Sequence, residues 1–260
     1  MFFESHGHFD NWVHLCDASY ILFMQSENTF WLNYQFKFPD ETEVTFEVCM
    51  DAETAAIELP DQVNLPEWTL LCKNKCSHCP LDASEHKHCP AAVSILDVVE
   101  YFHSVSSIES VEVLVTSPDR QTRKGGVGLP AAIAALMGAR FAGSGCPITA
   151  KFKPMLRHHL PFSSYEEATY RIVSMHALAQ LLRMREGLEP DWELKELSKM
   201  CQDVNTLNLD FCRRLRSLEV NDSTMNALTG LDSLLQMVDI SMDEELLEDM
   251  KKLFRAHLKE

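Results

Sequence analysis

The chain has 260 residues, of which 46% are hydrophobic, and it carries 39 acidic against 23 basic residues for a net charge of -16. This length and composition fit one or two globular domains. No apolar run in the sequence approaches the roughly 18 to 20 residues of a membrane span. The acidic balance also argues against general nucleic-acid binding, because phosphate groups repel a negatively charged protein.

Residues 1–23 show no pattern comparable with the rest of the chain, and we interpret them as an N-terminal arm. They have no basic segment and contain Glu4, Asp10 and Asp17, which argues against a secretory signal. We therefore predict a cytoplasmic protein. Its nine cysteines then remain mostly thiols and serve as metal ligands or core residues.

Residues 24–160 predict an α+β domain. A β-hairpin is expected from Phe30 to Cys49, because aromatic and branched residues recur at every second position on both sides of a turn-rich tetrapeptide. After a cysteine-rich loop, the pattern predicts a helix over Pro90–Ser104, a strand over Ser110–Ser117 and a helix over Leu129–Gly143. The last helix is rich in small residues, which favours close packing. The stretch RQTRKGGVGLP before it is interpreted as a flexible turn, with an anion-binding nest as the alternative.

Residues 161–260 predict an all-α helical bundle. Ser164 and Glu167 form a capping-box pattern, and the helix that they open is apolar all around, which predicts a buried central helix that ends at Gly187. Two shorter helices are expected over Ser223–Val238 and Asp243–Leu258.

A heptad-like seam lies between these predicted helices and contains one polar residue, Asn208. Such a seam is typical of a dimer with a fixed register, and packing inside a bundle explains it equally well. The seam consists of Leu194, Leu197, Cys201, Val204, Asn208, Phe211, Leu215 and Leu218.

The segment CKNKCSHCPLDASEHKHCP, residues 72–90, is the strongest functional signal. Cys76 and Cys79 have the C-x2-C spacing that brings two thiolates to one ion, and Cys89 supplies a third. The candidates for a fourth ligand are Cys72, His86, His88 and the distant Cys146. This set predicts a metal site, and zinc is the metal that we favour.

An iron-sulfur cluster is the alternative cofactor, because cysteine ligation serves either metal. The spacing of Cys72, Cys76 and Cys79 resembles the three-cysteine motif of radical SAM enzymes. That interpretation would need the repeated strand-helix units of a barrel, which the sequence does not show. In an enzyme interpretation, Cys146 with His158 and His159 lines a redox or metal-dependent reaction centre. In a structural interpretation, the same residues belong to a packed turn.

Several short stretches together resemble an uncharacterised bacterial family that is described as a domain of unknown function. These stretches are CSHCPL, HCP, SGCP and LRHHLPF followed by EEATYR. The resemblance spans about Met24 to Arg185 and implies that Cys76, Cys79, Cys89 and Cys146 belong to one domain. It implies no activity, and Cys72 is outside its pattern.

From these observations we expect a cytoplasmic bacterial protein with a structural or regulatory zinc site. Its C-terminal helices would contact a protein partner or a second copy of the chain.

Overall fold

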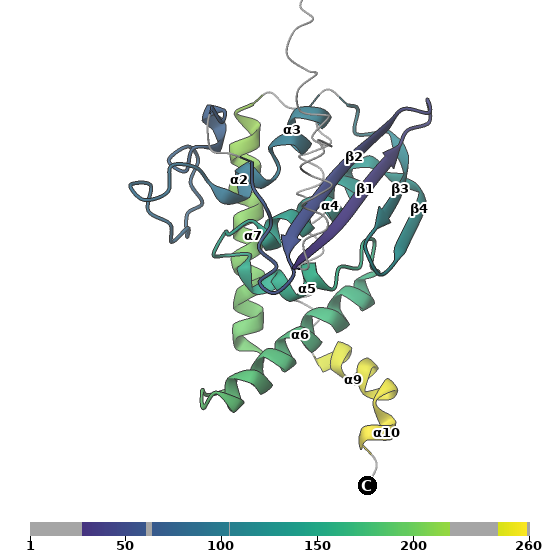
Figure 1. The fold of residues 1–260 in the computed structure, drawn as a ribbon. Helices are drawn as coiled ribbons and strands as arrows, with labels where there is room; N and C mark the ends of the chain where they lie inside the picture. Colours follow the sequence, from purple (N-terminus) through teal and green to yellow (C-terminus); the bar gives the residue numbers. More distant parts are fainter. Residues whose placement is uncertain (1–27, 61–63, 104, 219–243, 259–260) are drawn as a thin grey trace, which may run out of the picture.

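A computed structural model describes residues 28–60, 64–103, 105–218 and 244–258 (Figure 1). The predicted arm at 1–23 and the predicted helix at 223–238 lie outside the described residues. Within those residues the fold is a mixed α+β arrangement, as the sequence predicts, with a four-stranded sheet and a layer of helices. Among the described helices, none is long and apolar enough to cross a membrane.

The sheet is antiparallel and has the order β2-β1-β3-β4. Its first two strands form the predicted hairpin, in which Thr29 pairs with Asp51 and Lys37 pairs with Glu43. The four strands are β1 (Thr29–Lys37), β2 (Glu43–Asp51), β3 (Ser110–Thr116) and β4 (Gln121–Gly128).

The interpretation of RQTRKGGVGLP as a flexible turn was wrong, because most of this stretch forms β4. The strand pairs with β3 from Thr116↔Gln121 to Ser110↔Gly128, with an irregularity between Val111 and Val113. β4 lies at the edge of the sheet and is largely exposed, so its sequence has no apolar alternation. The formation of such an edge strand depends more on its pairing with the adjacent strand than on the apolar pattern of its own sequence.

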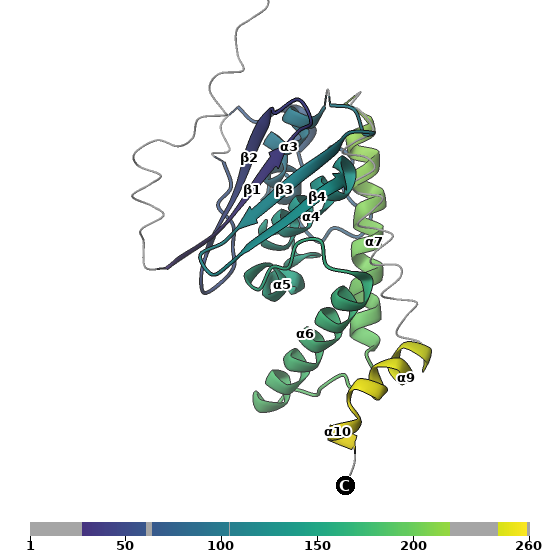
Figure 2. The ribbon, with the colours of Figure 1, turned by 90° about the vertical axis from the view of Figure 1, so that its right-hand side faces the viewer.

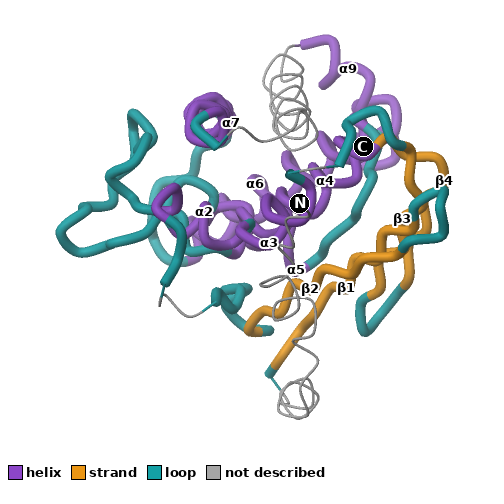
Figure 3. The backbone as a smooth tube through the Cα atoms, turned by 90° about the horizontal axis from the view of Figure 1, so that it is seen from above, coloured by secondary structure: helices purple, strands orange, loops and turns teal. Residues whose placement is uncertain are grey.

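One face of the sheet is covered by helices, as Figures 2 and 3 show. β1 alternates between buried and partly buried residues and sends Phe30, Leu32, Tyr34 and Phe36 into the core. α4 (Leu129–Gly143) lies against this face and is largely buried. The helix predicted over Pro90–Ser104 is divided at Ile95 into α2 (Pro90–Ser94) and α3 (Leu96–Phe102).

The C-terminal half continues with α5 (Lys153–Arg157), α6 (Tyr165–Arg185) and α7 (Lys195–Arg216). The capping box of α6 is confirmed, since Ser164 accepts from the Glu167 amide at 3.2 Å and Glu167 accepts from the Ser164 amide at 2.7 Å. Gly187 follows the helix with a positive φ of 75°. Short 3-10 turns lie at Glu67–Thr69 (η2) and Ala150–Phe152 (η3).

The prediction that α6 is a buried central helix was wrong. Only one narrow face is buried, formed by Ala168, Thr169, Ile172, His176 and Gln180. Leu178, Leu182 and Met184 on the other faces are more than half exposed. Apolar residues occur on every side of the helix. Among the described residues, however, other segments pack against only one side of it.

α7 packs against two parts of the molecule. Its C-terminal half contributes Leu207, Phe211 and Leu215 to the core of the sheet domain. Its N-terminal half packs Leu197 and Val204 into a second cluster with α6. Most of the predicted seam is therefore covered within the chain. α9 (Glu244–Leu253) and α10 (Arg255–Leu258) lie where the last helix was predicted.

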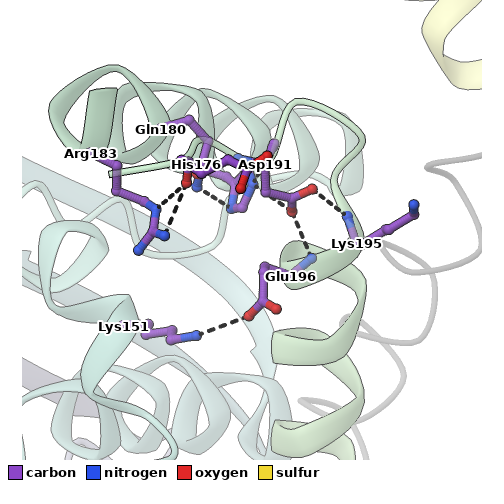
Figure 4. A network of polar contacts seen from close by, with 8 residues as sticks. Lys151, His176, Gln180, Arg183, Asp191, Lys195 and Glu196 are labelled. Atoms are coloured by element: carbon purple, nitrogen blue, oxygen red, sulfur yellow. Dashed lines mark hydrogen bonds and ion pairs between the residues drawn. The ribbon is translucent and has the colours of Figure 1, made fainter. Parts of the chain in front are cut away.

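A polar network joins α6 to the start of α7 (Figure 4). Asp191 accepts hydrogen bonds from the backbone amides of Lys195 at 3.2 Å and Glu196 at 2.7 Å. Its own amide donates to Gln180 at 2.8 Å, and His176 lies 3.4 Å from its carboxylate. Asp191 thereby satisfies two unpaired amides at the beginning of α7.

Candidate metal centre

The cysteine-rich loop lies beside the C-terminal half of α7, which fixes it at several points (Figure 1). Leu71 donates to the Lys87 carbonyl at 2.9 Å, and Cys89 donates to the Thr69 carbonyl at 2.7 Å. These bonds hold the two ends of the loop side by side. The loop between them contains the C-x2-C turn, in which the Cys79 amide donates to the Cys76 carbonyl at 3.0 Å.

α7 supplies two buried charged residues to this loop, Asp210 and Arg214. Asp210 is 3% exposed and accepts from the amide of Ser77 at 2.6 Å and from its hydroxyl at 2.9 Å. Arg213 also forms an ion pair with Asp210. His78, in the same turn, bonds to the Asp203 carbonyl at 2.8 Å. The turn between Cys76 and Cys79 is therefore held by side-chain and backbone groups of one helix.

Four cysteines from three segments lie close to one another. Burial, together with the neighbouring thiols of Cys89, Cys146 and Cys79, raises the pKa of Cys76 to about 12. Burial likewise raises the pKa of Cys146, and Cys79 adds to that effect. Each of these shifts requires that the sulfur atoms lie within electrostatic range of one another. The structure thus brings together Cys76, Cys79, Cys89 and Cys146.

Backbone amides lie next to two of these sulfurs. Burial raises the pKa of Cys89, while Arg214 and the amides of Ala92 and Ala91 oppose the shift. The amides of Ile148 and Thr149 act in the same way on Cys146. Both cysteines precede proline, which has no amide hydrogen, so the amides two and three residues later are the ones near the sulfur. Amide donors of this kind stabilise thiolates.

Arg214 is fully buried beside the cysteines. One of its terminal nitrogens donates to the carbonyls of Trp68 at 2.6 Å and Leu70 at 2.8 Å, and the other donates to Asn74 at 3.3 Å. Its Nε atom is buried and has no hydrogen-bond partner within the described part of the chain. The positive charge of the guanidinium opposes the rise in the pKa of both Cys76 and Cys89. A buried cation bonded to neutral carbonyls calls for negative charge nearby, and thiolates would supply it.

Two other predicted ligands, Cys72 and His88, differ in their surroundings. Cys72 is exposed and is not among the thiols that shift the pKa of Cys76, Cys89 or Cys146. His88 is buried, and its Nδ1 lies 2.7 Å from the Thr69 hydroxyl. Its Nε2 has no hydrogen-bond partner among the residues that the structure describes.

The four thiols are neighbours, but they do not converge on one point. Within residues 28–60, 64–103, 105–218 and 244–258, no three His, Cys, Asp or Glu side chains are arranged to hold one ion as they stand. Metal coordination at about 2.3 Å would require rotation of the cysteine side chains.

The histidines of the enzyme interpretation have other surroundings. His158 is exposed. His159 contacts the hydroxyl of Tyr34, which in turn lies 3.2 Å from the Ala135 carbonyl. Burial, together with the charges of Arg171 and Arg120, lowers the pKa of His159 to about 3, so its ring is neutral. The groups that shift the pKa of Cys146 include Cys79 and do not include either histidine.

Comparison with protein families gives one match. The model of a domain of unknown function, DUF6901, matches residues 32–255. The chain belongs to the DUF6901 family. The matched range of this DUF6901 protein includes most of the sheet, the cysteine loop and α7. No curated protein and no solved structure matches the chain.

The sequence interpretation missed Arg214 and Asp210 as parts of this site. Both flank the apolar seam of α7, where charged residues usually face solvent. Their spacing of four residues places them on one side of the helix, but nothing in that spacing indicates burial. Only the loop packed against α7 shows their role.

Proposed function

We propose that this DUF6901 protein binds one zinc ion through Cys76, Cys79, Cys89 and Cys146, in a closed site with a structural or regulatory role. The observation that carries the proposal is that Cys76 lies within electrostatic range of Cys79, Cys89 and Cys146, and that the buried Arg214 acts on Cys76 and Cys89. The Nε atom of Arg214 has no hydrogen-bond partner in the described chain. Four thiolates would give zinc its usual tetrahedral shell, and the guanidinium would offset part of their negative charge.

The bound metal would join parts of the chain that are far apart in sequence. Cys76 and Cys79 lie in the loop, Cys89 directly precedes α2, and Cys146 follows α4. Zinc would therefore cross-link the loop to the helical layer, as structural zinc does in small domains. The eight described cysteines form no disulfide, which fits a reducing compartment such as the bacterial cytoplasm.

The experiment is elemental analysis of protein purified without oxygen, for the wild type and for single serine variants. We expect one zinc per wild-type chain, and a loss of zinc together with a lower melting temperature in Cys79→Ser and Cys146→Ser. The exposed Cys72→Ser is the matched control and should keep both. Wild-type protein that neither contains zinc nor takes it up from solution would refute the proposal. Iron with acid-labile sulfide would support the iron-sulfur alternative instead.

The helical region is the proposed interaction surface. Leu178, Leu182 and Met184 of α6 and Leu188 and Trp192 after it are each more than half exposed in the described structure. Apolar side chains gathered at one end of a helix hairpin are typical of a protein contact. We therefore assign contact with a second copy of the chain to this end of α6 rather than to the covered seam of α7.

A further inference from the structure

A pocket of about 470 Å³ lies between α4, α5, α6 and α7. From the sequence, the small side chains of α4 are expected to pack closely against a neighbouring element. In the structure they border this open space instead. A pocket of this volume with apolar walls is in the usual range for small-molecule sites. The small α4 residues that line it are Ala131, Ala134, Ala135, Gly138, Ala139 and Ala142.

Asn208 of α7 lines the pocket and lacks partners. Its side chain is 1% exposed, and neither its amide nitrogen nor its amide oxygen is hydrogen-bonded to any described part of the protein. Its neighbours in the wall include Val204 and Phe141, which offer no polar group. A buried amide with both ends unsatisfied destabilises the fold, so a ligand with a hydrogen-bonding group would relieve the defect.

Basic side chains supply positive charge to the same pocket. Arg171 of α6 and Lys124 of β4 are part of its wall. Burial lowers the pKa of Arg171, and the nearby charge of Arg120 lowers it further. Among the described residues, none of these three basic groups forms an ion pair.

The other titratable groups near Arg171 offset its charge only in part. Glu167 is the carboxylate that raises the pKa of Arg171, and it already accepts from the Ser164 amide at the start of α6. His159, which also lines the pocket, is neutral. Arg171 itself donates to the His158 carbonyl at 2.5 Å and keeps further guanidinium donors.

We propose that this pocket binds an aliphatic carboxylate that carries a second polar group. Its hydrocarbon chain would lie along the alanines of α4, and its carboxylate would pair with Arg171, supported by Lys124 and Arg120. The second polar group would hydrogen-bond to the Asn208 amide. Apolar contact gives such a site most of its affinity, and the charged and amide groups set the orientation of the ligand. None of the four proposed zinc ligands lines the pocket.

The test is calorimetric titration of the full chain with three probes of one length: 10-hydroxydecanoate, decanoate and decan-1-ol. We expect the hydroxy acid to bind most tightly, decanoate less tightly and the alcohol least. Arg171→Gln should weaken both acids by about tenfold to a hundredfold, the effect of losing one charge-assisted hydrogen bond. Arg171→Lys should restore part of that loss, and the exposed Arg185→Gln on the same helix should change nothing.

Two further variants test the geometry. Ala135→Leu should abolish binding of both acids by filling the pocket, because leucine is a good helix former at this half-buried position. Asn208→Leu should remove the advantage of the hydroxy acid over decanoate and should raise the melting temperature of the ligand-free protein. Failure of the wild type to bind either acid would overturn the proposal. Equal affinity for the alcohol, or equal losses in Arg171→Gln and Arg185→Gln, would also overturn it.

Discussion

At the scale of single residues, several buried or partly buried charges in this protein are met by backbone groups. Arg214 donates to three loop carbonyls, Asp210 accepts from the Ser77 amide, and Asp191 accepts from two amides at the start of α7. A buried charge is costly when it loses such partners. These residues therefore fix the relative positions of segments that make little apolar contact with one another.

Asp191 gives a pH-dependent prediction. Burial alone would raise its pKa, but the amides of Glu196 and Lys195, together with His176, outweigh burial and lower it. A lowered carboxyl pKa adds stability above the unfolded pKa of about 4, and that stability disappears as pH falls through the folded pKa. We expect Asp191→Ala to reduce the free energy of unfolding by about 0.5 to 2 kcal/mol at pH 7.

Urea denaturation at several pH values measures this effect. The difference between wild type and Asp191→Ala should shrink as the pH is lowered from about 5 toward 2. Glu193→Ala is the control, since its ion pair with Lys195 is about three-quarters exposed and contributes little. A difference that stays constant across this range would show that the Asp191 carboxylate charge does not stabilise α7.

At the scale of elements, α7 organises the molecule. One face of its C-terminal half packs Phe211 against Phe141 of α4, with ring centroids 5.2 Å apart. The adjacent face holds the cysteine loop through Asp210 and Arg214, and its N-terminal half packs on α6. The loop has few buried apolar residues of its own, so its conformation depends on these polar contacts with α7.

Arg214→Met tests that dependence. Loss of the bonds to the carbonyls of Trp68, Leu70 and Asn74 should lower the free energy of unfolding by about 2 to 4 kcal/mol. It should also expose the loop to trypsin at its lysines. Arg216→Met is the matched control, because Arg216 is exposed on the same helix and does not contact those carbonyls. If both variants resist trypsin like the wild type, α7 does not hold the loop through Arg214.

At the scale of the whole molecule, the described chain has a well-buried sheet domain and a less covered helical end. α6 extends away from the sheet, as Figure 2 shows, and several of its exposed residues are apolar. Water contact of this extent is unfavourable for leucine and methionine side chains. A second copy of the chain would cover them.

Light scattering decides this point. We expect a dimer for the wild type at micromolar concentration and a monomer for Leu182→Glu, because a carboxylate in the apolar contact would be desolvated without a partner. Leu209→Glu is the control, since Leu209 is also more than half exposed but lies on α7. A wild-type monomer would contradict assignment of a dimer contact to α6.

The sequence by itself determined the features that depend on local interactions. The β1-β2 hairpin follows from its alternation of apolar residues, the start of α6 follows from Ser164 and Glu167, and the C-x2-C turn follows from its spacing. Each of these involves residues close together in the chain, so a short pattern contains the necessary information.

Only the tertiary structure decided which distant residues meet. It placed Cys146 with the loop cysteines and left Cys72 exposed, it paired β4 with β3, and it left one side of α6 uncovered. It also buried Arg214. The physical reason is that burial and pairing depend on which surfaces are packed together, and residue type and spacing along the chain do not specify those contacts.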